Sequence, residues 1–441
     1  MNKKFGLILP IILISYFMIL LDNSIVFTST VKIATDLQLN ESTLAWVTNA
    51  YALTFGGLLL LGGRAGDVFG RRRVFLIGLI IFSVGSLFVG LATSGTVMIS
   101  MRAIQGIGSA ILAPTTLALL MDSYQGPMRT KAIAYYGATG GLGASLGLVI
   151  GGLIASYLSW RIGFLLNVPI GIIMILLTLK FIPVSQPSGG HIDWLGSLLS
   201  VLGIATLVYS INGAQQPIIM LAVSIILLSL FIWQERRSAE PIMPLRLFVN
   251  RERSSAYIAR FFFLGAMISY FFLAPQAMQH VYGFTPLMAA IGFLPETIPQ
   301  FIFATLVVRL NNYFSNTMIM IVGTLITFLG LLIGSLVGIQ SGYIWSVAVP
   351  MVIIGIGQGL SLSPLTVAGV ANTDPQIAGS ASGVVNTVHQ VGSSVGLSIV
   401  TLLTAGISSP VISFDHASWI MTTLMGIAVL EVINIIGSNN R

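Results

Sequence analysis

Polar positions in this chain are confined to short stretches between long apolar runs. Each run is about long enough to cross a bilayer as a helix, because roughly 20 apolar residues span the hydrocarbon. The pattern predicts an all-α polytopic membrane protein with fourteen transmembrane helices. The runs lie near residues 7–29, 43–62, 74–92, 97–121, 132–155, 162–182, 193–213, 217–234, 255–280, 286–308, 317–338, 343–371, 377–406 and 417–436.

Composition and the distribution of charge support this prediction. Hydrophobic residues make up 55% of the 441 residues and charged residues 7%, whereas a soluble domain carries about 25% charged residues. If the N-terminus is cytoplasmic, sixteen Lys and Arg residues fall at the inner side and only Lys32 and Arg161 at the outer side. This bias predicts cytoplasmic termini. The net charge of +7 therefore reflects membrane topology, and we do not expect nucleic-acid binding.

The chain also contains an internal repeat. AILAPTTL near Pro114 matches SLSPLTV near Pro364, and GLGASLGL from Gly141 resembles QVGSSVGL from Gln390. The offset stays near 245–250 residues, which predicts two homologous six-helix halves with a site between them. We expect an N-terminal half at 1–184, two inserted helices and a cytoplasmic linker at 185–253, and a C-terminal half at 254–441.

Four ionisable residues interrupt the apolar runs and are candidates for proton coupling or cation binding. They are Asp22, Arg102, Glu296 and His389. Intramembrane charges are costly and usually serve ion or substrate pathways. The alternative for Asp22 is a fixed structural partner for Arg102, and Arg102 could instead extend to the membrane surface. Glu296, between Pro295 and Pro299, is expected in the opposite half at a depth similar to that of Asp22. A histidine such as His389 titrates near neutral pH, but in this position it is more often a polar packing residue than a proton relay.

The loop expected after the second run carries GGRAGDVFGRRR (62–73). Glycines at 63, 66 and 70 permit a tight turn, and Asp67 can accept hydrogen bonds from a helix N-terminus or pair with an arginine. This stretch, RAIQG at Arg102 and the first run around Asp22 resemble motifs of the major facilitator superfamily, specifically its fourteen-helix drug:proton antiporter branch. The resemblance covers nearly the whole chain. It implies a cytoplasmic gating loop of Gly63, Asp67, Gly70 and Arg71, and a coupling role for Arg102.

A glycine pattern in the fifth run resembles the antiporter motif of that branch. It contains Gly143, Gly147, Gly151 and Gly152, with Leu148 where the family has proline. Four-residue spacing places the first three on one face, where another helix can approach closely. Aromatic residues attract lipophilic cations, and Phe27, Tyr51 and Tyr136 are candidate cavity residues, although most aromatics in such proteins face lipid or the interface.

Absent motifs narrow the energy source. The sequence has no GxxxxGK[ST] phosphate loop, no cysteine and no paired-histidine metal spacing. We therefore expect no enzyme activity, no metal and no cofactor, with an ion gradient as the energy source. The resemblance implies that the ion is the proton. Partners are expected to be protons, small lipophilic or cationic compounds and the bilayer, with the protein a monomer.

The resemblance implies proton-coupled export of lipophilic, cationic drugs from a bacterial cell by alternating access. Two alternatives remain at this stage. One is a dedicated exporter of a specific metabolite, lipid or tetracycline-like compound. The other is a membrane sensor that uses a transporter fold without transport.

Overall fold

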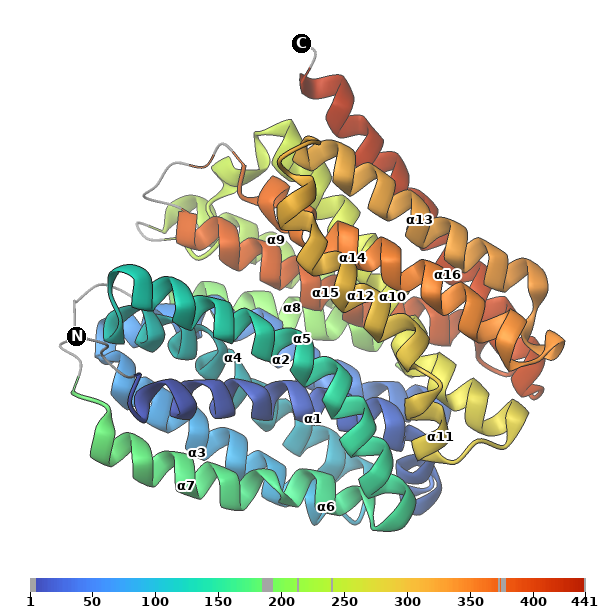
Figure 1. Cartoon of the computed structure of the whole chain (residues 1–441), viewed down its shortest axis with the longest axis horizontal. Coiled ribbons are helices and arrows are strands. Elements are labelled where there is room, and N and C mark those ends of the chain that lie inside the picture. Colours follow the sequence, from blue (N-terminus) through green and yellow to red (C-terminus); the bar gives the residue numbers. More distant parts are fainter. Residues whose placement is uncertain are drawn as a thin grey trace.

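The computed structural model describes residues 5–184, 193–211, 214–238, 241–371, 373 and 378–439. Within these ranges the chain is helical and contains no strand. The first group of helices comprises α1 (Ile8–Leu37), α2 (Glu41–Phe69), α3 (Arg71–Gly90), α4 (Gly95–Ser123), α5 (Gly126–Tyr157), α6 (Trp160–Leu165) and α7 (Asn167–Phe181). They pack together as one bundle, drawn in blue to green in Figure 1.

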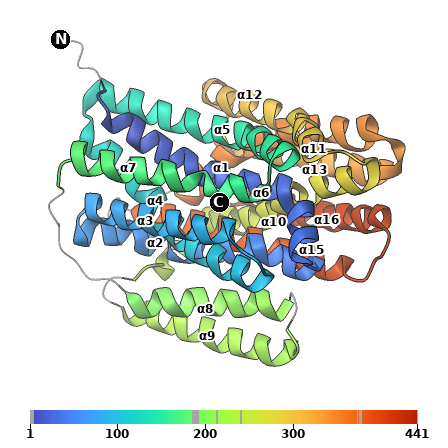
Figure 2. The same ribbon diagram turned by 90° about the horizontal axis from the view of Figure 1, so that it is seen from below.

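Two helices, α8 (Trp194–Ile211) and α9 (Pro217–Arg237), follow the first bundle and form a hairpin at its edge (Figure 2). A short 3₁₀ segment at Leu245–Phe248 leads into the second bundle. That bundle comprises α10 (Arg251–Tyr282), α11 (Pro286–Ile291), α12 (Leu294–Leu310), α13 (Asn316–Val337), a 3₁₀ turn at Ile339–Ser341, a π-helical segment at Ile344–Ala348, α14 (Val349–Gly369), α15 (Ala378–Thr404) and α16 (Pro410–Asn439).

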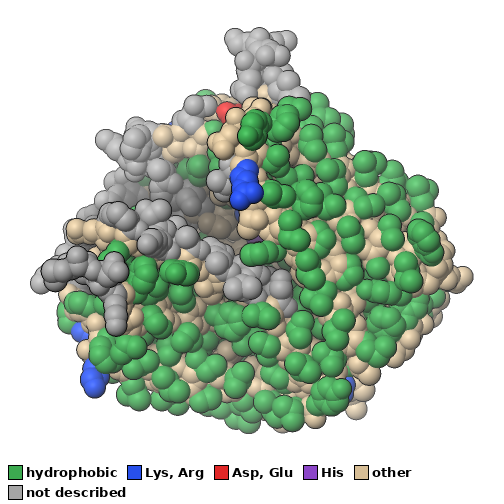
Figure 3. Space-filling view, viewed as in Figure 1, with side chains coloured by type: hydrophobic (Ala, Val, Ile, Leu, Met, Phe, Trp, Pro, Cys, Tyr) green, Lys and Arg blue, Asp and Glu red, His purple; other side chains and the backbone are tan. Residues whose placement is uncertain are grey.

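The helices follow the predicted apolar runs in order, although α1 and α2 extend several residues beyond the predicted ends. Eleven helical stretches in the described part of the chain are long and apolar enough to cross a membrane. Large hydrophobic side chains remain exposed over much of the surface, and they cover most of the face in Figure 3. A surface of this kind is suited to lipid, so the chain is an integral membrane protein.

Three departures from continuous helix lie close to prolines. The break at Leu166 precedes Pro169, the break at Gly292–Phe293 precedes Pro295, and the π-helical segment precedes Pro350. A proline in a helix removes the hydrogen bond to the carbonyl four residues earlier and its ring clashes with that carbonyl.

Basic residues gather at one end of the bundle, which we call the basic end. Here Gly70 joins α2 to α3, Arg71 pairs with Asp122 at the end of α4 (2.5 Å), and Arg72 donates to the carbonyl of Leu179 in α7. At the opposite end, Asp36 in α1 accepts from the Trp160 indole (2.8 Å). The positions of these residues agree with the predicted separation of charge between the two sides.

The two bundles contact each other mainly through α2 and α15, α5 and α11, and α1 and α10. Asn49 in α2 donates to Ser398 in α15 (3.0 Å), and Ser156 in α5 accepts from the backbone N–H of Leu287 in α11 (2.8 Å). Phe27 in α1 packs on Phe271 in α10, with ring centroids 6.0 Å apart. Figure 3 shows the surface hollowed between the bundles, on the side of the N-terminus.

Candidate functional site: a buried polar network in the first bundle

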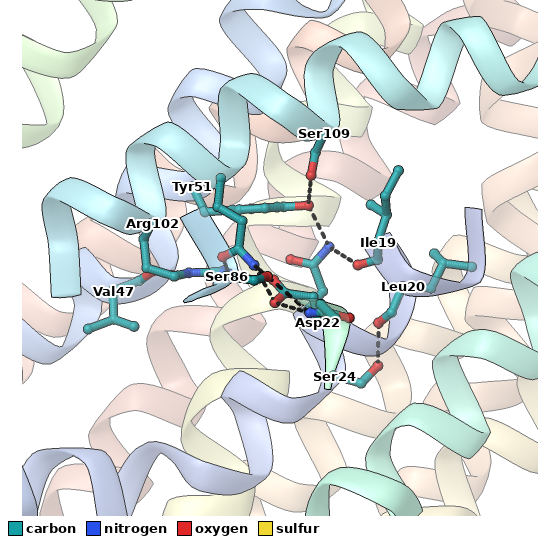
Figure 4. A network of polar contacts seen from close by, with 12 residues as sticks. Ile19, Leu20, Asp22, Ser24, Val47, Tyr51, Ser86, Arg102 and Ser109 are labelled. Atoms are coloured by element: carbon teal, nitrogen blue, oxygen red, sulfur yellow. Dashed lines mark hydrogen bonds and ion pairs between the residues drawn. The ribbon is translucent and has the colours of Figure 1, made fainter. Parts of the chain in front are cut away.

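Asp22 and Arg102 form a buried ion pair in the first bundle. Arg102 Nη1 lies 2.5 Å from Asp22 Oδ2, and the two side chains are 1% and 0% exposed. Asp22 lies at the middle of α1, because this helix continues to Leu37 rather than ending near residue 29. The pair joins α1 to α4 (Figure 4).

Further side chains complete the hydrogen bonding of this pair. Gln105 donates to Asp22 Oδ1 (2.6 Å) and accepts from Arg102 (2.7 Å), and Asn167 also donates to Asp22 Oδ1 (3.2 Å). Ser86 Oγ accepts from both amides. The break before α7 makes Asn167 the first residue of that helix, so Asp22 receives donors from two helices, α4 and α7. Buried charges need such partners to persist in a low-dielectric interior.

Tyr51 is part of the same network. The Arg102 guanidinium lies 4.2 Å from the centroid of the Tyr51 ring, and Arg102 Nε donates to the carbonyl of Val47 (3.1 Å). The Tyr51 hydroxyl donates to Ser109 (2.7 Å) and accepts from Asn23 (3.4 Å). Tyr51 is only 2% exposed, and its ring lies beside Arg102. We expected Tyr51 to line an open cavity, and in this conformation it does not. A cation over an aromatic face is favourable when desolvated.

The second bundle holds Glu296 and His389 apart from this network. Glu296, near the start of α12, is fully buried, and both carboxyl oxygens lack a hydrogen-bond partner. Its backbone packs closely on Gly355 of α14. His389 in α15 contacts Arg260 in α10 (3.1 Å). Asp22 and Glu296 lie in opposite bundles as predicted, but the structure does not bring them together.

The predicted gating loop is mostly helix. Gly63 and Gly66 lie inside α2 and face Pro114 and Thr115 of α4, so the expectation of a glycine-rich turn is wrong at these two positions. Gly70 alone forms the turn, with φ +91°, a conformation that favours glycine. Arg71 pairs within its own bundle, with Asp122. The side chain of Asp67 lies outside the described residues.

The predicted glycine face is present. A Cβ at Gly143, Gly147 or Gly151 would meet Leu20, Ser24 or Ile25 of α1, and one at Gly152 would meet Ala290 of α11 in the other bundle. Among the candidate cavity residues, Phe27 lies between the bundles, and half-buried Tyr136 stacks on Tyr16 with centroids 4.1 Å apart.

Several network residues were not singled out from the sequence. Gln105 lies in the RAIQG motif and could have been found there. Asn167 is a buried amide in an apolar run just before a proline, which is a weak signal. Ser86 has no signal, because serines are common in such helices.

Solved structures with the same arrangement of helices are membrane transporters. The chain is similar to a mutant form of the nucleoside transporter NupG, with a TM-score of 0.71 and 13% identity, covering 98% of this chain and 100% of that chain. It is also similar to the inward open xylose transporter XylE of E. coli, with a TM-score of 0.68 and 15% identity over 97% and 95% of the two chains. At these identities the likeness concerns the fold.

The Major Facilitator Superfamily family model matches residues 12–397, and the chain belongs to this superfamily of transporters. It is 34% identical to a cephamycin export protein of Amycolatopsis lactamdurans, over 88% of this chain and 83% of that protein. It is 30% identical to a puromycin resistance protein of Streptomyces alboniger, over 95% and 85% of the two. A methylenomycin A resistance protein of Streptomyces coelicolor is 30% identical, over 94% and 88%.

Proposed function

We propose that this protein exports antibiotics or similar toxic compounds from a bacterial cell in exchange for protons. The relatives named as export and resistance proteins support the direction and the class of cargo. The observation that carries the coupling is the buried Asp22–Arg102 pair, which holds α1 and α4 together at the middle of the membrane-spanning bundle. Intramembrane ion pairs of this kind commonly form ion and proton pathways.

Coupling follows from what a proton does to this pair. A proton that binds Asp22 Oδ2 removes the negative charge that attracts Arg102. Arg102 keeps its bonds to Val47 and Gln105, so α1 loses its ionic link to α4 and is held there by the weaker hydrogen bond from Gln105 to Asp22 Oδ1. In our proposal this weakening lets the first bundle rotate against the second, and loss of the proton on the other side restores the pair.

We assign Glu296 as a second proton or cation site. A charged carboxylate buried without partners is costly, and the oxygens of Glu296 have none. The group is therefore more stable in this conformation with a bound proton or beside a cationic cargo. This assignment supports lipophilic cations among the substrates, with the cation replacing the proton.

The remaining features of the proposal concern topology and partners. Counting α6 with α7, α11 with α12 and the π-helical segment with α14 gives fourteen membrane crossings, with both termini cytoplasmic. The proton gradient supplies the energy, without a cofactor, and the protein acts as a monomer. Neither bundle is expected to bind nucleic acid.

The test uses inverted membrane vesicles with an acidic interior. Addition of a lipophilic cation should collapse the pH gradient with the wild-type protein and fail to do so with Asp22→Asn. The matched control is Asp36→Asn, because Asp36 contacts Trp160 at the opposite end and should leave coupling intact. Cation-driven proton release that persists in Asp22→Asn would exclude this role for Asp22.

A dedicated exporter of one compound is the second candidate, supported by the similarity to a cephamycin export protein. Such a transporter would release protons for one compound and ignore a panel of unrelated lipophilic cations. The same vesicle assay separates the two candidates.

A further inference from the structure

Arg260, Thr366 and His389 form a polar cluster in the second bundle, one residue from each of α10, α14 and α15. Arg260 Nη1 donates to Thr366 Oγ1 (2.9 Å), and Arg260 Nη2 lies 3.1 Å from His389 Nδ1. A guanidinium only donates, so Nδ1 must accept. His389 is therefore neutral in this arrangement, with its proton on Nε2.

The charge of Arg260 is not compensated by any acid in the described part of the chain. The side chain is 6% exposed, and its buried Nε has no hydrogen-bond partner. Arg102 is equally buried in the first bundle but is paired with Asp22. A buried guanidinium without an anion is costly in a membrane protein and marks a binding site for one.

The cluster adjoins the space between the bundles. On α15, Asn386 is exposed and His389 and Gln390 are half-buried. Thr387 of the same stretch donates to the carbonyl of Gly56 in α2 (3.2 Å), so this part of α15 lies against the other bundle. Polar residues in membrane helices face the protein interior or a water-filled cavity, and a ligand there would reach Arg260 beside His389.

The internal repeat places a different cluster at the matching position of the first bundle. Thr116 and Thr366 each lie two residues after the matched prolines Pro114 and Pro364. Thr116 hydrogen-bonds to Tyr136 (3.1 Å), which stacks on Tyr16. These three residues lie in α1, α4 and α5, which are the first, fourth and fifth membrane crossings of the first bundle. The corresponding crossings of the second bundle are α10, α14 and α15. The cluster in the first bundle is thus aromatic and neutral, whereas the matching cluster in the second bundle is cationic.

We propose that Arg260, with Thr366 and His389, binds a carboxylate or similar oxyanion of the transported compound, while Tyr16 and Tyr136 receive its apolar part. The substrate class would be an apolar, aromatic body with an acidic group, whether or not a cation is also present. A planar guanidinium can bind a carboxylate through two parallel N–H donors. Nε and Nη2 of Arg260 supply these donors once Nη2 leaves His389. The proposal specifies the cargo of the exporter and rests on the proposed function.

The test compares two dyes that differ only in the acidic group, rhodamine B and its methyl ester. Their binding to the purified protein in detergent is measured by fluorescence anisotropy. The wild-type protein should bind the free acid more tightly, and Arg260→Gln should weaken its binding about tenfold or more, as loss of a charged hydrogen bond predicts. Binding of the methyl ester should be unchanged, which a merely structural role for Arg260 would not produce.

The matched control is Arg237→Gln, because Arg237 lies over Trp233 on the peripheral helix α9. Arg260→Lys keeps the charge but not the two-donor geometry and should fall between wild type and Arg260→Gln. Equal binding of both dyes by the wild-type protein would overturn the proposal even if Arg260→Gln fails to fold. An unchanged preference for the free acid in folded Arg260→Gln would also overturn it. A third contrary outcome would be displacement of the dye by phosphatidylglycerol but not by unlabelled benzoate. These measurements need no proton gradient, so their outcome is independent of the Asp22→Asn experiment.

Discussion

The carboxylate of Asp22 has donors on both oxygens, from Arg102 on one side and from Gln105 and Asn167 on the other. This arrangement suits the charged form, because a carboxylate accepts from all three donors, whereas a protonated oxygen must also place its own hydrogen. We therefore assign the conformation described here to the deprotonated state of the proposed cycle. Protonation must then be accompanied by a change in the geometry around Asp22.

The ion pair makes a prediction about stability. Arg102→Gln should lower the free energy of unfolding by about 3–5 kcal/mol, because it leaves the Asp22 charge buried without its partner. The double variant Asp22→Asn/Arg102→Gln should recover part of this loss. Thermal unfolding in detergent, followed by circular dichroism, measures both.

Arg161→Gln provides the control for that series. Arg161 lies 3.9 Å from Asp36 in a partly exposed pair, and such pairs contribute about 1 kcal/mol or less. If Asp22→Asn/Arg102→Gln is as unstable as Arg102→Gln alone, the loss of stability in Arg102→Gln does not come from the unpaired charge of Asp22.

At this scale the sequence predicted the charged residues but not their neighbours. Asp22, Arg102 and Glu296 are conspicuous because charge is rare in apolar runs. Ser86 and Asn167 are not, since their importance comes from helices that meet only in the fold. Gly63 and Gly66 were misassigned because a glycine that permits a turn and one that permits close helix packing look the same in a sequence.

Helix α5 approaches α1 through its glycine face, one turn from Asp22. The four-residue spacing was sufficient to predict this contact, because the periodicity of a helix fixes which residues share a face. The proline-associated irregularities were harder to predict. Pro114, Pro275 and Pro364 lie within continuous helices, so proline alone does not determine where a helix breaks.

Gly147→Val should separate α5 from α1. The added Cβ would lie 2.7 Å from the Ser24 Cβ, and overpacking of this kind costs about 1–3 kcal/mol. A lower unfolding temperature and weaker proton coupling are expected together. Leu153→Val, at an exposed position of the same helix, should change neither, and a stable Gly147→Val variant would show that the contact is adaptable.

At the level of the whole molecule, the order and approximate bounds of the long helices followed from apolar runs, because the bilayer sets their length. The relative placement of the two bundles could not be predicted from these runs, since it depends on contacts such as Asn49–Ser398 between residues far apart in the chain. The domain boundaries at residues 184 and 253 stay a prediction.

In the proposed cycle of alternating access, the contact between α5 and α11 opens during transport. The variant Ser156→Cys/Leu287→Cys places two thiols where Ser156 now accepts from Leu287, and the natural chain has no cysteine to compete. Oxidation should stop export in the vesicle assay, and reduction should restore it. Each single variant is the control, and undiminished export by the cross-linked protein would show that this end stays closed.

The peripheral hairpin has a consequence for how the bundles move. Val208 of α8 packs with Leu53 of α2 and Val395 of α15, so the hairpin spans the seam between the two bundles. It can keep both contacts only if the bundles pivot close to that seam. The bundles would then separate least along this seam and most between α5 on one side and α11 and α12 on the other. In the proposed export cycle, cargo would enter and leave between these three helices, on the side of the molecule away from the hairpin.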